Sequence, residues 1–148
     1  MRSATAFADS AIRYSFDGDW GNPVLWGANG PYDFYERTHR NRRTVSEDLR
    51  AVSKAGEGVR WVVGAYGLHL TEGNDLLDLY NGDVYRTLVS DYAATNLALY
   101  GQLDIDLAPQ LVLSAGLRGE RRSASYSDSN ALRFDPADDM LGGHLALT

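Results

Sequence analysis

The stretch NLALYGQLDIDLAPQLVLSAGLRGERR, residues 96–122, holds two runs in which apolar and polar residues alternate, with Ala108-Pro109-Gln110 between them. Alternation with a period of two predicts extended strands with two chemically different faces. In the first run one face holds Leu97, Leu99, Gly101, Leu103, Ile105 and Leu107. The other face holds Asn96, Ala98, Tyr100, Gln102, Asp104 and Asp106. The stretch therefore predicts a β-hairpin, and the medium that its leucines contact decides the fold.

The rest of the chain carries the same strand pattern and no convincing helix. We expect further strands at residues 2–14, 42–53, 59–72 and 140–148, and the first strand of the hairpin begins near residue 84. Clusters of Gly, Asn, Asp and Pro separate these runs, as turns require. The expected fold class is all-β: an antiparallel, up-and-down meander of about six long strands.

The expected connections alternate between long and short. Residues 16–41, 73–83 and 127–139 form long or polar connections, whereas residues 54–58 and 108–110 form short ones. Long loops at one end and short turns at the other are typical of an outer-membrane barrel. Along each strand of such a barrel, side chains that face lipid alternate with side chains that face the interior. Long strands also exceed the ~5–6 residues usual in globular sheets. We therefore interpret residues 1–148 as one segment of a transmembrane β-barrel. A soluble β-sandwich or small barrel stays open as the alternative.

Composition excludes several classes of function. The formal net charge of −6 argues against nucleic-acid binding, which needs a basic surface. The chain has no Cys, so neither a disulfide framework nor a thiol nucleophile is possible. It has no continuous apolar run of ~18 residues, so no transmembrane helix is expected. We also see no signal peptide, because Asp9 interrupts the start too early for an apolar core.

Three motifs resemble the TonB-dependent outer-membrane receptors. The run YGQLDIDLAPQLVLSAGLRGE, residues 100–120, resembles a recurrent barrel hairpin of that family. Residues 60–66, RWVVGAY, resemble its W-x-x-G-x-Y strand, and residues 46–50, SEDLR, resemble its S-x-E-L-R strand with Asp48 where Glu is usual. Gly119 stands where the family often has an aromatic residue.

The resemblance implies an outer-membrane receptor for energised uptake of a scarce ligand, such as a ferric siderophore, cobalamin or a glycan. It implies contact with outer-membrane lipid and lipopolysaccharide, and coupling to the TonB complex through a plug domain. We expect residues 1–148 to be an internal part of the barrel without that plug domain, and therefore not competent for transport alone.

The aromatic and basic segment 16–41 is the best candidate for a ligand-binding loop. Aromatic rings supply rigid contact area, and arginines can pair with an anionic ligand. The simpler interpretation is that the rings pack on the barrel rim and the arginines contact lipopolysaccharide or solvent. The candidate ligand-contacting residues are Trp20, Trp26, Tyr32, Tyr35, Arg37 and Arg40.

No pattern supports catalysis, a metal site or a bound cofactor. His39, His69 and His144 are far apart in sequence and lack metal-ligand spacing. We expect His69 and His144 to face the interior of the barrel. Asp104 and Asp106 share a face but flank a short turn, where a solvated pair is more common than a catalytic one. We therefore expect no enzyme, and a soluble carbohydrate-binding module remains the alternative function.

Overall fold

The computed structural model describes residues 1–19, 21, 24, 27, 33–54 and 58–148. These residues form no helix that is long and apolar enough to cross a membrane. The strands are β1 (Arg2–Asp17), β2 (Phe34–Val52), β3 (Val59–Tyr80), β4 (Asp83–Ala108), β5 (Leu111–Asp128), β6 (Arg133–Phe134) and β7 (Ala137–Leu147). The all-β prediction is confirmed.

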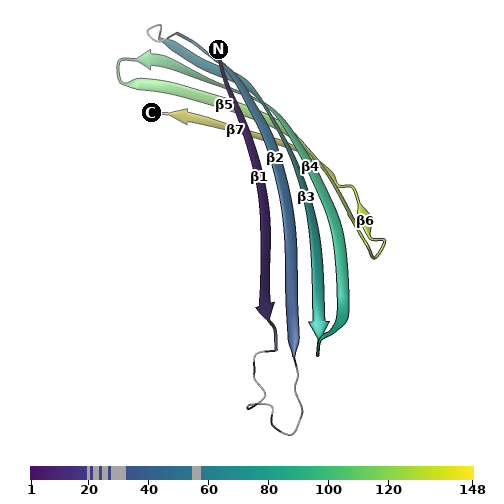
Figure 1. The fold of residues 1–148 in the computed structure, drawn as a ribbon. Coiled ribbons are helices and arrows are strands. Elements are labelled where there is room, and N and C mark those ends of the chain that lie inside the picture. Colours follow the sequence, from purple (N-terminus) through teal and green to yellow (C-terminus); the bar gives the residue numbers. More distant parts are fainter. Residues whose placement is uncertain (20, 22–23, 25–26, 28–32, 55–57) are drawn as a thin grey trace.

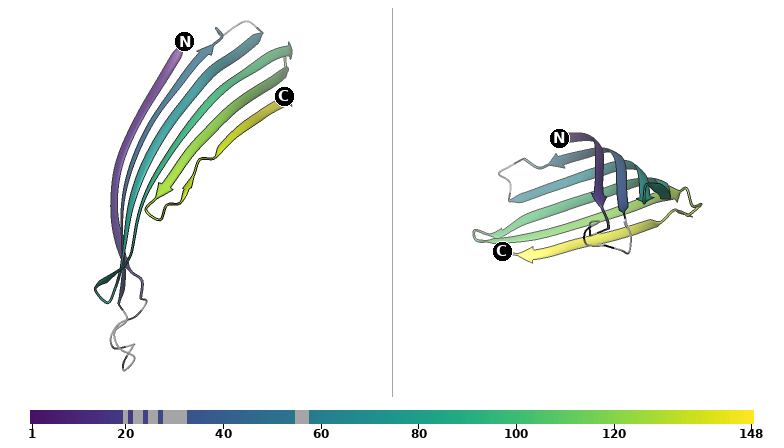
Figure 2. Two further views of the ribbon diagram at one scale, coloured as in Figure 1. Left: turned by 90° about the vertical axis from the view of Figure 1, so that its right-hand side faces the viewer. Right: turned by 60° about the horizontal axis from the view of Figure 1, so that its bottom comes forward.

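The strands form one antiparallel sheet in chain order, an up-and-down meander. Both β6 and β7 pair with β5, because the chain leaves the sheet briefly between them. Figures 1 and 2 show a single, strongly curved layer in which the two termini lie towards the same end. Among the described residues no second layer packs on either face, so the architecture is that of an open barrel segment and not of a sandwich.

All three predicted long connections are shorter in the structure, because residues within them continue or join the strands. The connection at 127–139 is interrupted by β6, and β7 already begins at Ala137. β2 begins at Phe34, so the predicted loop at 16–41 shrinks to residues 18–33. The expectation that residues 73–83 form a long connection is wrong, because β3 continues to Tyr80. Gly73 pairs with Asn41 on one side and Asp91 on the other, so its backbone groups belong to the sheet ladder.

The connection after β3 is instead the two-residue turn Asn81-Gly82. Both residues have positive φ, 51° and 86°, which matches the type I′ turn that suits the twist of hairpin strands. β3 and β4 therefore extend well beyond the end of β5, and β1 and β2 run beside them, with Phe34 paired to Tyr80. The predicted alternation of loop lengths holds after β1 but fails after β3, whereas the predicted length of the fourth strand is confirmed, at 26 residues.

Curvature distinguishes the two faces of the sheet. Side chains converge on the inner side of a curved sheet and spread apart on the outer side. Ala94 and Ala98 are the buried hydrophobic residues, with exposed fractions of 7% and 5%, and both lie on the same face of β4 as Ser90. We therefore assign this face as concave. Leu97 and Leu99, which alternate with them, are 58% and 70% exposed on the convex face.

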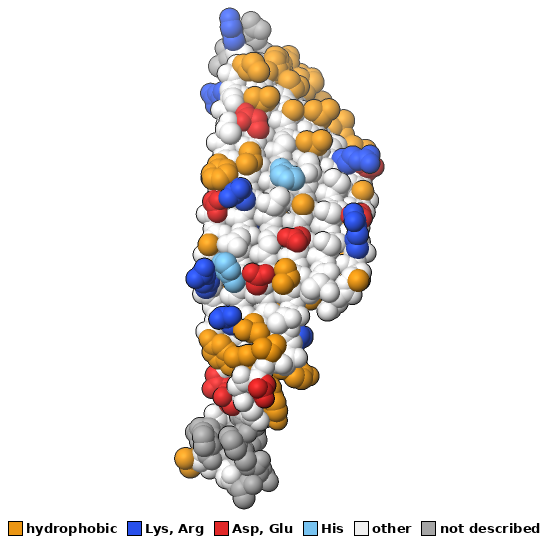
Figure 3. All heavy atoms as spheres, turned by 45° about the vertical axis from the view of Figure 1, so that its right-hand side comes forward, with side chains coloured by type: hydrophobic (Ala, Val, Ile, Leu, Met, Phe, Trp, Pro, Cys, Tyr) orange, Lys and Arg blue, Asp and Glu red, His pale blue; other side chains and the backbone are white. Residues whose placement is uncertain are grey.

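The convex face carries a band of exposed hydrophobic side chains near the short turns (Figure 3). The strand pairing aligns Leu99 with Gly119 and Leu141, and Leu103 with Ala115 and Leu145. A soluble protein rarely exposes a continuous apolar surface of this extent, whereas a lipid-facing barrel wall requires one. The hydrophobic members of the band are Trp61, Val63, Leu97, Leu99, Leu103, Leu107, Leu117, Leu141, Leu145 and Leu147.

Candidate functional site

The concave face of the sheet carries a polar wall, in contrast to the apolar convex band. At its centre the phenol of Tyr100 on β4 donates a hydrogen bond of 2.6 Å to a carboxylate oxygen of Asp48 on β2, which lies 52 residues earlier in the chain with β3 between the two strands. The guanidinium of Arg118 lies 5.8 Å from the ring centre of Tyr66 and 5.9 Å from that of Tyr100. These contacts tie β2, β3, β4 and β5 together across the wall.

Arg118 also pairs with Glu120 on the same strand, with 2.6 Å between Nη2 and Oε2. Asp48 pairs with Arg50 in the same way on β2. Each charge of this central cluster therefore has an opposite charge or a hydrogen-bond partner. Both ion pairs join residues two positions apart on one strand, and the cross-strand contacts come from the two tyrosines.

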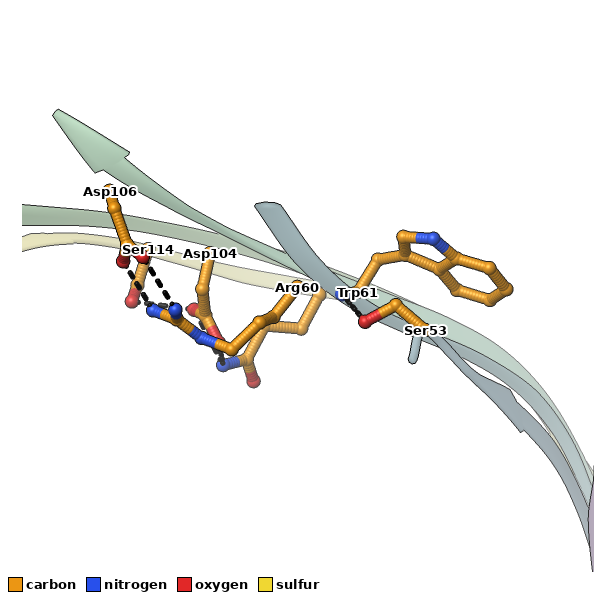
Figure 4. A network of polar contacts seen from close by, with 7 residues as sticks. Ser53, Arg60, Trp61, Asp104, Asp106 and Ser114 are labelled. Carbon is orange, nitrogen blue, oxygen red and sulfur yellow. Dashed lines mark hydrogen bonds and ion pairs between the residues drawn. The ribbon is translucent and has the colours of Figure 1, made fainter. Parts of the chain in front are cut away.

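A second cluster lies on the wall near the short turns (Figure 4). Arg60 forms two hydrogen bonds with the carboxylate of Asp106, at 2.8 and 2.7 Å. Asp104 accepts hydrogen bonds from Ser114 at 2.6 Å and from Gln102 at 3.0 Å. In Figure 4 the ring of Trp61 points away from these groups, towards the convex side. The cluster is fully paired, which supports a structural role for Asp104 and Asp106.

A third cluster lies beyond the apolar band, towards the long loop. Arg42 pairs with Glu72 at 2.5 Å, and Arg40 donates a hydrogen bond of 2.9 Å to Asn74. Burial raises the pKa of Glu72, but hydrogen bonds from Asn74 and Arg42 and the charges of Arg42 and Arg40 outweigh it. The net pKa of Glu72 is therefore lowered, and the carboxylate stays ionised in this half of the wall.

Asp78 is a residue that the sequence analysis did not single out. It is the most buried side chain among the described residues, at 1% exposure, and Arg86 binds one of its oxygens at 2.8 Å. Its other oxygen and the hydroxyl of Thr38 are buried without a hydrogen-bond partner in the described part of the chain. A bulge next to Asp78 shifts the pairing of β3 with β4. A local alternation pattern carries no signal for such a bulge.

The structure describes three of the six predicted ligand-contacting residues. Trp20, Trp26 and Tyr32 lie outside the described residues. Tyr35, Arg37 and Arg40 lie on β2 and not in a loop, so that part of the prediction is wrong. Alternation places Arg40 on the concave face and Tyr35 and Arg37 on the convex face, so the structure does not bring the two arginines together. Their contact with a ligand stays a prediction.

The two histidines expected to face the interior lie on opposite faces. His144 pairs in register with Gly116 on the concave face, where its ring covers the position that a Gly116 side chain would occupy. His69 lies on the convex face, and its Nδ1 lies 2.9 Å from the hydroxyl of Thr95. The expectation for His69 is therefore wrong, because its position in the alternation puts it beside Ala65 and Gly67. No group of three or more His, Asp or Glu in the described part of the chain is placed to hold a metal ion.

Comparisons with known proteins identify the family. Residues 1–144 match the model of the family described as TonB dependent receptor-like, beta-barrel. The ferric yersiniabactin uptake receptor of Yersinia pestis is similar at 19% identity and a TM-score of 0.73, over 98% of this chain and 22% of that chain. A copper transporter is similar at 15% identity and a TM-score of 0.66, over 98% of this chain and 24% of that one.

The ferric preacinetobactin receptor of Acinetobacter baumannii is similar at 15% identity and a TM-score of 0.57, over 98% of this chain and 25% of that chain. Identities this low show the fold alone, and the chain spans about a quarter or less of these solved proteins. A search of curated proteins found no match. The family match over residues 1–144, together with the apolar convex and polar concave faces of one meander, shows that the chain belongs to the TonB-dependent receptor β-barrel family.

Proposed function

We propose that this chain forms part of the barrel wall of an outer-membrane receptor that takes up a scarce ligand such as a ferric siderophore. The observation that carries the proposal is the chemical difference between the faces of one curved sheet. The convex leucines suit contact with lipid, and the paired charges of the concave wall suit a hydrated or protein-filled interior. The soluble carbohydrate module has no comparable support, because no second layer covers the leucines among the described residues.

The 148 residues are proposed to be an internal section of the barrel, which does not transport by itself. β1 and β7 each have one side without a partner among the described strands, and such edges pair readily with other strands. In the proposed receptor, neighbouring barrel strands occupy both edges. A plug domain supplied by the rest of the receptor transmits energy from the TonB complex, and lipid with lipopolysaccharide surrounds the convex face.

A ferric chelate is the ligand class that we propose first. Two of the similar solved proteins are named as receptors for ferric yersiniabactin and ferric preacinetobactin, although their identities of 19% and 15% support the fold and not the ligand. Arg40 and Arg42 place positive charge on the concave wall beyond the apolar band, where an anionic chelate would approach. Cobalamin and glycans remain the other outcomes of the ligand test.

The test uses the full-length reading frame that contains this chain. A host strain that lacks the gene should lose energised uptake of one ⁵⁵Fe-labelled siderophore from a panel, and the restored gene should recover it. A proton uncoupler should abolish that uptake, because the energy comes from the inner membrane. Unchanged uptake of every ferric siderophore in the deletion strain would refute the proposed class of ligand, and lost uptake of labelled cobalamin or of a labelled glycan would identify one of the other outcomes. Absence of the protein from the outer-membrane fraction would refute the proposed location.

A further inference from the structure

One row of paired residues places two carboxylates side by side at the end of the sheet that carries the long connection after β1. The row runs through Phe16, Glu36, Asp78 and Arg86, on the same face of the sheet as the polar wall. Glu36 on β2 is directly opposite Asp78 on β3. Opposite residues of an antiparallel pair have Cβ atoms about 4.5–5.5 Å apart, where two like charges destabilise the sheet. Positive charge is therefore required close to this pair.

Arg86 supplies positive charge to only one side of Asp78. Its Nε and Nη2 atoms both lie 2.8 Å from the same carboxylate oxygen, Oδ2 of Asp78. Arg86 belongs to β4 and Glu36 to β2, so they lie on opposite sides of Asp78 in the sheet. Among the described residues Glu36 has no hydrogen-bond or ion-pair partner. Two carboxylates therefore share one guanidinium, and one negative charge is left unbalanced.

Two buried oxygen atoms next to Glu36 also have no hydrogen-bond partner within the described part of the chain. They are Oδ1 of Asp78, whose side chain is 1% exposed, and Oγ1 of Thr38, whose side chain is 4% exposed. Thr38 lies two residues after Glu36 on the same face of β2 and is a diagonal neighbour of Asp78 across the strand pair. Buried oxygens in proteins accept hydrogen bonds or coordinate a metal ion, so these two favour a cation between β2 and β3.

The chemistry of these three side chains suits a hard cation. They offer only carboxylate and hydroxyl oxygens, which Ca²⁺ and Mg²⁺ prefer, and no nitrogen or sulfur ligand for zinc or copper. Ca²⁺ accepts irregular sets of about six to eight oxygens that include water, whereas Mg²⁺ demands a nearly ideal octahedron. Ligands fixed on two paired strands form an irregular set. Only two carboxylates take part, which agrees with the absence of a group of three or more acidic or histidine ligands in the described chain.

We infer that Glu36, Thr38 and Asp78 bind one calcium ion, with water completing its coordination shell. The ion neutralises the carboxylate that Arg86 leaves unbalanced, and it joins β2 to β3 beside the long connection. In the proposed receptor this end of the barrel lies outside the cell. Extracellular calcium modules have dissociation constants on the order of 10⁻⁴–10⁻³ M, which is the range we expect here. The inference does not depend on which ligand the receptor takes up.

The test titrates calcium chloride into the purified full-length receptor by isothermal titration calorimetry. The receptor is refolded in detergent without lipopolysaccharide, whose phosphate groups also bind divalent cations, and a chelator removes metals before the titration. Glu36→Gln removes a charged ligand at nearly constant shape, and Thr38→Val removes the hydroxyl in the same way. Glu120→Gln is the matched control, because it makes the same change on the same face at a glutamate that is already paired with Arg118.

We expect the wild type and Glu120→Gln to bind Ca²⁺ at one site that Glu36→Gln loses or binds about tenfold more weakly, with a smaller loss in Thr38→Val. Ca²⁺ should also slow amide hydrogen exchange in wild-type peptides that cover residues 33–40 and 74–80, and not in those of Glu36→Gln. Equal Ca²⁺ titrations for the wild type and Glu36→Gln would overturn the inference. Protection confined to other peptides would overturn it as well, and equal protection by Mg²⁺ would overturn the assignment to calcium.

Discussion

Gly64 is the position where one methyl group should disturb the concave wall most. The ring of Tyr100 lies directly over Gly64, and a Cβ there would be 2.3 Å from Cζ and 2.5 Å from the phenol oxygen. Carbon atoms in ordinary contact are about 3.5–4.0 Å apart, so the ring must move by more than about 1 Å. This movement separates the phenol from Asp48 and the ring from Arg118.

Gly64→Ala should therefore destabilise the receptor. Overpacking of a fitted site costs about 1–3 kcal/mol. Alanine also loses less conformational freedom than glycine on folding, which offsets about 0.5–1 kcal/mol of the overpacking cost. The net expectation is a loss of about 1–2 kcal/mol in the free energy of unfolding, a change of about 5- to 30-fold in the folding equilibrium.

The assay is reversible urea unfolding of the full-length receptor in lipid vesicles, followed by tryptophan fluorescence. Gly67→Ala is the control, because a Cβ there meets Leu97 at an ordinary 3.6 Å. A double-mutant cycle with Tyr100→Ala isolates the contact, since Gly64→Ala should cost nothing once the ring is absent. Equal destabilisation in the presence and absence of Tyr100 would refute the steric reasoning.

Three further outcomes are expected. Gly82→Ala should destabilise the β3–β4 hairpin by about 1–2 kcal/mol, because Gly82 has a φ of 86°, and an unchanged urea midpoint would contradict this. The pKa of Glu72 is lowered from its ordinary 4.5, so its stabilisation is complete above that pH and is lost as pH falls through the folded-state value. Acidification should therefore lower the urea midpoint of wild type more than that of Glu72→Gln. Arg60→Lys keeps the charge but loses the paired hydrogen bonds to Asp106, so its urea midpoint should fall below that of wild type. A midpoint equal to wild type would show that charge alone is sufficient there.

Alternation was sufficient to predict most of the sheet. The hairpin at 96–122 has the predicted faces, since Leu99 is exposed on the convex side and Tyr100 bonds to Asp48 on the other. Errors arose where strands continue through residues that usually mark turns or loops. Gly73-Asn74-Asp75 and the start of β2 are polar on both faces, so their composition resembles a loop. Pairing with strands distant in sequence satisfies their backbone groups, and no local pattern reports such pairing.

The candidate site was less predictable than the fold. Arg40 and Arg37 are close in sequence, yet alternation along β2 puts them on opposite faces. His69 was misassigned because β3 carries apolar residues on both faces, so alternation alone does not show which face is interior. The register alone aligns Asp9 with Arg43 and Thr71, which come from three different strands. Asp78 depends on a bulge that the pattern does not encode.

The amino-acid sequence by itself determined that the chain forms long strands with one apolar and one polar face, because each residue's polarity and the period of two are local properties. Asn81 and Gly82 tolerate positive φ, but the sequence pattern placed them in a longer connection at 73–83. Only the tertiary structure decided which residues from different strands share a row, which face is concave and how closely the ring of Tyr100 covers Gly64. Those properties depend on register and curvature, which arise when strands far apart in sequence pair.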